Sequence, residues 1–249
     1  MKLKYIIAAA LLTALATNTR AQNVRSFDLN LQLGYNIGAT APIPLPAEVR
    51  KINSYNPKFN PSLGLTLAYG LNEKWGLGAG VVFDWKGMRV KDEVKYMHTT
   101  VTNPDGDGQL TGYFVGENMT NVNMTYLTVP IYATYSFNPK WQVKLGIYAA
   151  KALSFGFDGN VNNGYIRIDT PTGQKQEIDG EGASFDFNND IRDYDFGFLA
   201  GGEYRLSHRF GVYANLAWGV VPFFYKNSNP IEFTMTNIYG TVGITYRFR

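Results

Sequence analysis

The segment FDLNLQLGYNI, residues 27–37, alternates apolar and polar residues along its whole length. A period of two places successive side chains on opposite faces of a β-strand, so this segment predicts a strand with one apolar and one polar face. An even number of such strands is what a closed antiparallel barrel with both chain ends on one side requires. The same alternation recurs, less cleanly, in seven further segments, which gives eight in all: residues 63–69, 75–85, 127–137, 141–149, 194–204, 210–218 and 238–248.

The composition agrees with a β-protein. The chain has 249 residues, no cysteine, 17 Tyr, 16 Phe and 26 Gly, and 17% of its residues are charged. The absence of cysteine excludes a disulfide scaffold, and a chain this aromatic can bury enough surface to offset its ordering entropy, which argues against disorder. A single all-β barrel of this length is ordinary.

The N-terminal residues read as an export signal. Lys2 and Lys4 precede an apolar run over residues 5–16, which is short for a spanning helix, and a small-residue region follows. We expect cleavage after Ala21, with cleavage after Ala16 as the alternative. The predicted domains are therefore a signal peptide, 1–21, and an outer-membrane β-barrel domain, 22–249. The mature chain then has 20 basic and 20 acidic residues, without the basic footprint of a nucleic-acid binder.

The connections between the expected strands alternate in length. Short turns lie around residues 71–74, 138–140 and 206–209, whereas residues 39–59, 87–121, 154–193 and 221–233 form long connections. Short periplasmic turns at one rim and long extracellular loops at the other are typical of outer-membrane barrels. The sequence thus predicts an all-β fold, an eight-stranded antiparallel up-and-down transmembrane β-barrel in the outer membrane of a Gram-negative bacterium.

The two faces of the strands suggest which side meets lipid. A soluble lipocalin-type barrel has its apolar face inside, so alternation alone does not decide the matter. Here the other face is largely glycine or small and polar, which suits the crowded lumen of an eight-stranded barrel better than a water-facing surface. Its members are Gly34, Asn36, Gly64, Thr66, Gly76, Gly78, Gly80, Gly146, Gly197, Gly201, Gly211, Asn215, Thr241 and Gly243.

Aromatic residues stand where the two membrane interfaces are expected. Trp75 and Trp85 share a face and are ten residues apart, which at about 3.3 Å per residue and about 40° tilt is roughly 25 Å of height, the expected thickness of the apolar band. The alternative is an ordinary aromatic core in a soluble barrel. The predicted interface aromatics are Trp75, Trp85, Trp141, Trp218, Tyr69, Tyr135, Phe137, Tyr204, Phe210 and Phe248.

From about residue 26 to its end the chain resembles the PorT-like outer-membrane β-barrel proteins of Bacteroidota. The resemblance is carried by the order and spacing of several short stretches. It implies an outer-membrane barrel, and the namesake of the family takes part in type IX secretion. The stretches are PSLGLTLAY at 61–69, DWKG at 84–87, YLTVPI at 126–131, GIY at 146–148 with Leu153, DFG at 195–197 and GGEY at 201–204.

Several charged residues share the parity of the lumen set. Isolated charges inside a narrow barrel are costly, so we expect acids and bases to pair across it, with Glu203 near Lys144. Pro130 cannot donate to the strand ladder and predicts a bulge. The expected lumen charge network comprises Asp84, Lys86, Lys144, Asp195, Glu203, Arg205 and Arg247.

The long connections offer few candidates for chemistry. Residues 154–193 hold eight acidic and three basic residues, which indicates a solvated loop or, alternatively, divalent-cation bridging to anionic lipid headgroups. Asn103, with the proline, aspartate and glycine that follow it, predicts a turn that caps a hairpin above the membrane rather than a calcium loop. The two histidines, His98 and His208, are expected at opposite rims, and no nucleophile motif accompanies them.

These observations predict a non-enzymatic protein without a metal or cofactor. The glycine run Gly76-x-Gly78-x-Gly80 lies within a strand and is not a dinucleotide loop. We expect a structural or interaction role, with outer-membrane lipid and lipopolysaccharide as neighbours. Secretion-complex or envelope proteins are the partners that the resemblance implies. A small-solute channel and a soluble ligand-binding barrel are the alternatives.

Overall fold

The computed structural model describes residues 27–102, 108–178, 180, 182–225 and 233–248. The predicted signal peptide and the tip of the predicted hairpin at 103–107 lie outside these residues. Within them the chain is almost entirely antiparallel β-structure, with one short 3-10 helix, η1, at Asn188–Asp190. The strands are β1 (Phe27–Pro42), β2 (Val49–Pro57), β3 (Pro61–Gly70), β4 (Trp75–Thr102), β5 (Gln109–Ser136), β6 (Trp141–Ile168), β7 (Lys175–Ile178), β8 (Ala183–Asp186), β9 (Tyr194–Arg205), β10 (Phe210–Gly219) and β11 (Met235–Arg247).

Eight of these strands close into a ring in the order β1, β3, β4, β5, β6, β9, β10 and β11. The ring closes because β11 pairs with β1, from Asn30 opposite Arg247 to Pro42 opposite Met235. Each strand neighbours the next along the chain, as in an up-and-down barrel. The predicted fold class and each of the eight predicted strands are confirmed.

The strands β4, β5 and β6 continue far beyond the ring. Each has 28 residues, whereas a tilted strand crosses a bilayer in about 9–11. The pairing of β4 with β5 runs on to Thr102 opposite Gln109, which confirms the predicted hairpin. The expectation that 154–193 is mainly a loop is wrong, because β6 extends to Ile168 and β7 and β8 pair with it.

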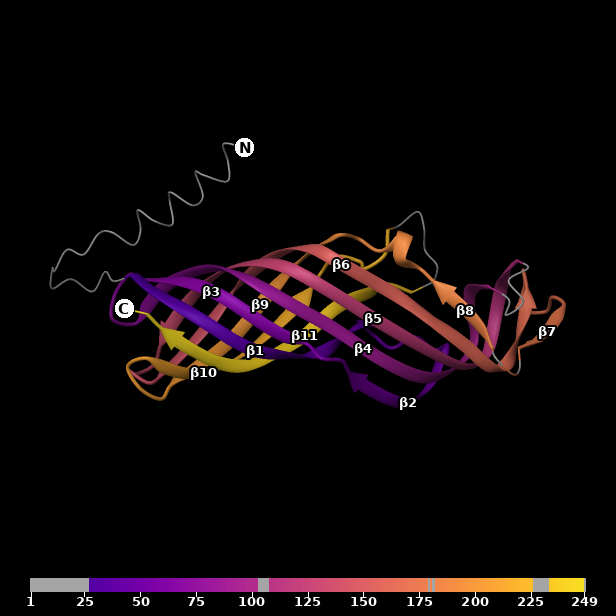
Figure 1. Cartoon of the computed structure of the whole chain (residues 1–249), viewed down its shortest axis with the longest axis horizontal. Helices are drawn as coiled ribbons and strands as arrows, with labels where there is room; N and C mark the ends of the chain where they lie inside the picture. Colours follow the sequence, from indigo (N-terminus) through magenta and orange to yellow (C-terminus); the bar gives the residue numbers. More distant parts are fainter. Residues whose placement is uncertain (1–26, 103–107, 179, 181, 226–232, 249) are drawn as a thin grey trace, which may run out of the picture.

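We call the part beyond the ring the head. It consists of β2, β7, β8, η1 and the distal halves of β4, β5 and β6, and it forms the end of the molecule opposite the short turns (Figure 1). β2 pairs with β4 from Val49 opposite Val94 to Pro57 opposite Met88, so it takes over the edge of β4 that β3 leaves free. A buried apolar cluster fills the head, including Phe114, Val122, Phe157, Val161 and Ile166.

The bulges lie in other places than predicted. The pairing on both sides of Pro130 keeps one register, with Ala79 opposite Ile131 and Val82 opposite Thr128, so the predicted bulge at Pro130 is wrong. Proline has no backbone N–H to donate to the neighbouring strand. Its absence here interrupts the pairing of β5 with β4, but neither strand has the extra residue that a bulge requires. The register shifts lie at Lys95/Met97, Val115/Glu117 and Thr125/Tyr126. No helix among the described residues is long and apolar enough to cross a membrane.

Candidate functional site: a filled lumen beneath a folded head

The outer surface of the ring is an apolar belt. Large aliphatic and phenylalanine side chains point outward on every strand of the ring, and Leu145 has 69% of its surface exposed. A water-soluble barrel buries such residues, so the prediction of an apolar outward face is confirmed and the alternative of a soluble ligand-binding barrel is wrong. Other members of the belt are Leu33, Ile37, Leu63, Leu65, Leu77, Val81, Phe83, Val129, Ile131, Val143, Ile147, Phe198, Val212, Leu216, Val242 and Ile244.

Aromatic rings flank this belt. Beside the short turns, rings on neighbouring strands touch in pairs: Trp75 and Tyr135 have centroids 4.9 Å apart, and Trp141 and Tyr204 have centroids 4.8 Å apart. The ring of Phe137 also contacts that of Tyr135, and the ring of Phe27 contacts that of Tyr69. The ring of Tyr246 contacts those of both Phe210 and Phe248. At the head side, Trp85 and Trp218 are exposed. The arrangement is that of an aromatic girdle, in which amphipathic rings suit the boundary between lipid and water.

The upper lumen holds two buried carboxylates, each solvated by neutral groups. Asp84 accepts hydrogen bonds from Asn36 Nδ2 at 3.1 Å, Ser62 Oγ at 2.8 Å and Thr128 Oγ1 at 2.9 Å. Asp195 accepts from Tyr148 at 2.9 Å and from Asn237 Nδ2 at 3.1 Å. Several hydrogen bonds to one carboxylate replace the water that burial removes.

The two buried lysines of the lumen lie against tyrosine rings. Lys86 Nζ is 5.1 Å from the ring centre of Tyr126, 5.6 Å from that of Tyr148 and 5.4 Å from that of Tyr239. Lys144 Nζ is 5.2 Å from the ring centre of Tyr132 and 5.3 Å from that of Tyr213. Cation–π attraction favours an ammonium at such distances. Gly78 makes room for one of these rings, because a Cβ there would collide with the side chain of Tyr132.

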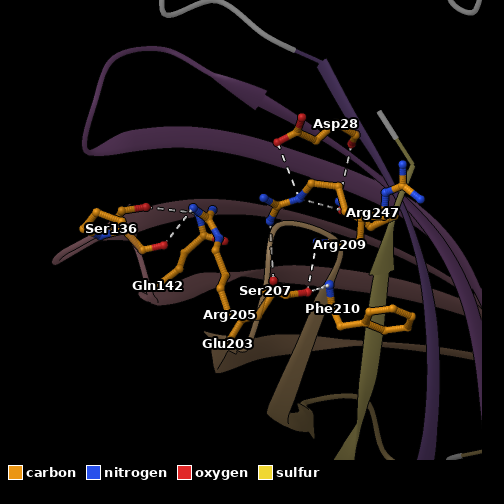
Figure 2. A network of polar contacts seen from close by, with 11 residues as sticks. Asp28, Ser136, Gln142, Glu203, Arg205, Ser207, Arg209, Phe210 and Arg247 are labelled. Atoms are coloured by element: carbon orange, nitrogen blue, oxygen red, sulfur yellow. Dashed lines mark hydrogen bonds and ion pairs between the residues drawn. The ribbon is translucent and has the colours of Figure 1, made fainter.

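The lower rim of the lumen carries a second polar network (Figure 2). Arg247 lies 3.8 Å from the carboxylate of Asp28 and 3.6 Å from that of Glu203. The expected ion pair of Glu203 with Lys144 does not form among the described residues, since the register places Glu203 opposite Gln142 and beside Arg247. Arg205 donates to the backbone of Pro139 at 3.4 Å. A polar hollow of about 250 Å³ opens at this rim.

The predicted lumen charges therefore form two levels. Asp84, Lys86, Lys144 and Asp195 lie buried in the barrel, and Glu203, Arg205 and Arg247 lie at the rim with the short turns. Acids and bases pair only at the rim; in the barrel the carboxylates have amide and hydroxyl donors, and the ammonium groups have aromatic rings. The prediction of ion pairing across the lumen is thus wrong for the buried level.

Among the residues that the structure describes, the head contains one buried carboxylate, that of Asp92. It accepts a hydrogen bond from Asn118 Nδ2 at 2.9 Å, on the neighbouring strand β5. Burial raises the pKa of Asp92 to about 6, because removal from water disfavours the charged form more than this hydrogen bond favours it. Burial also lowers the pKa of the Lys58 ammonium at the base of the head.

The two histidines lie far apart in the fold. His98 lies on β4 in the head, where its ring packs 5.1 Å from that of Tyr113, and His208 lies in the turn between β9 and β10 at the opposite end. The histidines stand at opposite rims, as expected. Among the residues that the structure describes, no three His, Asp or Glu side chains are grouped closely enough to hold a metal ion.

Residues 17–225 match the family described as outer membrane protein beta-barrel domain. The chain belongs to this family. The match covers most of the ring and the head, so the outward apolar belt belongs to an outer-membrane barrel. No curated protein matches the chain.

Solved structures of outer-membrane proteins resemble this family member at low identity. Ail, the attachment invasion locus protein of Yersinia pestis in complex with the heparin analogue sucrose octasulfate, is 14% identical, with 91% of this chain and 100% of that chain covered and a TM-score of 0.35. OprG of Pseudomonas aeruginosa is 12% identical, with 92% and 100% covered and a TM-score of 0.38. The outer membrane protease OmpT of Escherichia coli is 11% identical, with 94% and 100% covered and a TM-score of 0.35.

Sequence reasoning missed the tyrosines and amides that complete the lumen of this outer-membrane barrel. Asn237 links the Asp195 carboxylate to Tyr126, one of the rings around Lys86: its amide nitrogen donates to Asp195 and to the Tyr126 hydroxyl at 3.1 Å each, and its amide oxygen accepts from Thr40 at 2.7 Å. Two of the tyrosines could have been placed from the sequence, since Tyr126 and Tyr132 lie at even-numbered positions and therefore on the same face of the strand as Thr128. The other missed lumen residues are Ser62, Thr128, Tyr148, Tyr213 and Tyr239.

Proposed function

We propose that the protein is a non-enzymatic outer-membrane barrel that holds a folded head at the cell surface for contact with a partner protein of the envelope. The observation that carries this proposal is the length of β4, β5 and β6, whose distal halves enclose an apolar core of their own. A barrel that served only to span the membrane needs no such extension. Ordered β-structure beyond the bilayer is a surface on which recognition depends on shape.

The surface of the head supports an interaction role. Ile43, Leu45 and Ile52 are each more than half exposed on or beside β2, and Tyr55 and Tyr96 are exposed nearby on β2 and β4. Neighbouring exposed apolar side chains outside a lipid belt are typical of contact surfaces. The resemblance to PorT-like proteins makes a secretion-complex subunit the partner to look for first, and lipid and lipopolysaccharide are the expected neighbours of the belt.

The test is affinity purification of the tagged full-length protein from native outer membranes after mild crosslinking. The comparison variant is Ile52→Lys with Leu45→Lys, which places charge on the exposed surface beside β2. Arg209→Ala, in a short turn at the other end, is the matched control. We expect a specific companion with the wild type and with Arg209→Ala, and its loss with the double variant. Recovery of no companion from the wild type, or equal recovery from all three proteins, contradicts the proposal.

A small-solute channel is the second candidate, and one observation favours it. The hollow at the lower rim is followed inside the barrel by a smaller one of about 50 Å³, and both are lined by Gln32, Thr66, Tyr132 and Lys144. Above them the side chains of Asn36, Tyr126 and Tyr239 are almost completely buried, which fills the lumen. Reproducible conductance steps in planar bilayers, lost in a Gln32→Trp variant, would favour the channel over the scaffold.

A further inference from the structure

A cavity of about 230 Å³ lies in the head, beneath β2. Three exposed side chains, those of Leu45, Ile52 and Tyr55, stand at its rim, so it is reached from the outer surface of the head. The lining is mostly apolar and sulfur-containing or aromatic, which favours the hydrocarbon part of a ligand. Its inner wall includes Met88, Val90, Met97, Phe157, Phe185 and Phe187.

Polar groups interrupt this apolar wall: the hydroxyls of Thr40, Thr99 and Thr120, the Asn118 amide and the Asp92 carboxylate. The Asp92 carboxylate and the Asn118 side chain both line the cavity and are more than nine-tenths buried. Asn118 uses its Nδ2 group for Asp92 at 2.9 Å and for Thr120 Oγ1 at 3.1 Å. Its Oδ1 atom is buried without a hydrogen-bond partner in the part of the chain that the structure describes. Because this atom has almost no accessible surface, a donor in the cavity would meet the Asp92 carboxylate rather than Asn118.

No positive side chain lies within salt-bridge distance of Asp92 among the described residues. The strands packed beside it present Ile52 from β2 and Asn118 from β5 at the paired positions. Its neighbours along β4, Lys91 and Glu93, are exposed on the other face of the strand. A buried carboxylate of this kind lacks a counter-charge, and a ligand can supply one.

We propose that this cavity binds a small apolar primary amine in its ammonium form. The ammonium group donates to the Asp92 carboxylate, and the hydrocarbon part lies against Met97 and the phenylalanines. A cavity of about 150 Å³ holds benzene, so this one has room for about ten non-hydrogen atoms. A phenylalkylamine or a straight-chain amine of medium length fits that volume.

Other ligand classes fit less well. An alcohol of the same shape donates one hydrogen bond and leaves the carboxylate charge without a partner, and an anion is repelled by it. A divalent cation requires several oxygen ligands, and Asp92 belongs to no group of acidic or histidine side chains among the described residues. The cavity shares Leu45, Ile52 and Tyr55 with the proposed contact surface, whereas Asp92 lies beneath that surface, so variants of Asp92 test amine binding separately from the interaction role.

The test is calorimetric titration of the full-length protein in lipid nanodiscs at pH 7.5 with 2-phenylethylamine, and with 2-phenylethanol as the neutral ligand of the same shape. Empty nanodiscs give the correction for partition into lipid. We expect the amine to bind at least about tenfold more tightly than the alcohol, because a charge-assisted hydrogen bond is stronger than a neutral one. Equal affinity of the two ligands, or no binding of the amine beyond that of empty nanodiscs, overturns the proposal.

Three variants sharpen the result. Asp92→Asn keeps the shape of the side chain and removes its charge. It should lower the affinity for the amine by about tenfold or more and change the affinity for the alcohol by no more than about threefold. Glu93→Gln, an equal loss of charge on the exposed face of the same strand, should leave the affinity for the amine within about twofold. Val90→Phe narrows the cavity and should lower the affinity for both ligands. If Asp92→Asn and Glu93→Gln behave alike, or Val90→Phe binds both ligands as the wild type does, the cavity is not the binding site.

Discussion

Strand β4 passes through two environments, and its two halves follow opposite patterns. Between Trp75 and Trp85 the outward side chains are apolar, and the inward ones are glycine or polar except for Val82. Beyond Trp85 the outward side chains are charged and the inward ones are mainly apolar. In the lower half the outward residues are Leu77, Ala79, Val81 and Phe83, and the inward ones include Gly76, Gly78 and Asp84. In the upper half the outward residues include Arg89, Lys91, Glu93 and Lys95, and the inward ones include Met88, Val94, Met97 and Val101.

This inversion shows that the medium, rather than the strand, decides which face is apolar. In the ring, hydrocarbon outside takes up the apolar face and the narrow lumen takes polar groups that satisfy one another. In the head, water lies outside, so the same sheet must bury its apolar residues against β2, β8 and the loop at Phe223. The head is thus stabilised as a soluble protein is, and the ring as a membrane protein is.

The largest expected effect tests the core of the head. Phe157 is almost fully buried and touches the rings of Phe185, Phe187, Phe223 and Phe224. We expect Phe157→Ala to lower the free energy of unfolding of the head by about 3–5 kcal/mol, through lost burial and the cavity that remains. Amide hydrogen exchange measures it, because it reports the head and the ring separately.

The control for this variant is Phe155→Ala, two residues earlier on β6, where the side chain is exposed. It should change protection in the head by less than about 1 kcal/mol. Equal losses of protection in the head and in the ring after Phe157→Ala would show that the two regions unfold as one unit, and the distinction between them would fail.

The next effect tests the belt. Leu145 lies on the outward face of β6, in the apolar belt between Trp141 and Lys151. Leu145→Lys should cost about 2–4 kcal/mol of unfolding free energy in lipid, the range for a cation on the lipid face at mid-depth. Urea titration of the protein in lipid vesicles measures the change. A loss below about 1 kcal/mol would place Leu145 in water and the belt elsewhere.

How much the sequence could predict also follows from this contrast. The period of two was uninterrupted in the ring and identified all eight of its strands. In the head, the register shift at Lys95/Met97 changes the inward set of β4 from even to odd positions, and the shift opposite Val115/Glu117 changes that of β6 from odd to even, so a search for alternation loses these strands there. Residues 87–121 were therefore predicted to be a loop, although all of them that the structure describes, except Gly108, lie in β4 and β5.

The candidate site was predictable to a lesser extent. Parity along each strand is local information and was enough to predict that Asp84, Lys86, Lys144 and Asp195 face inward; all four are buried in the structure. Which group solvates which charge depends on the stagger between strands and on closure of the ring, and neither is local. The Asp92 carboxylate was missed for the same reason, since its burial depends on β2 folding back over β4.

The third prediction concerns the stability of the head as a function of pH, which the Asp92 carboxylate should control. The pKa of Asp92 is about 6 in the folded protein, above its value near 3.8 in the unfolded chain, so the folded state binds the extra proton. The contribution to stability is complete below about pH 4 and is lost as the pH rises through 6, by up to about 3 kcal/mol. Asp92→Asn should remove this dependence.

Hydrogen exchange in the head, corrected for the intrinsic rate at each pH, measures the effect for the wild type and for Asp92→Asn between pH 4.5 and pH 8. Glu93→Gln is again the control, because that carboxylate is exposed and contacts Asn53 and Lys51 at the surface. If the wild type and Asp92→Asn show the same pH dependence, burial does not control this carboxylate.

The smallest effect lies at the level where the two regions meet. Lys151 follows the apolar outward residues of β6, six positions above Leu145, and forms an exposed ion pair with Asp193. Exposed pairs contribute less than about 1 kcal/mol, and substitutions on the lipid face near the interface cost about as little. Lys151→Leu should therefore change the unfolding free energy by at most about 1 kcal/mol, although it is the chemical reverse of Leu145→Lys. The ratio of the two effects, measured in the same vesicles, locates the boundary between hydrocarbon and water on β6, and two effects of equal size would mean that the boundary does not lie between these positions.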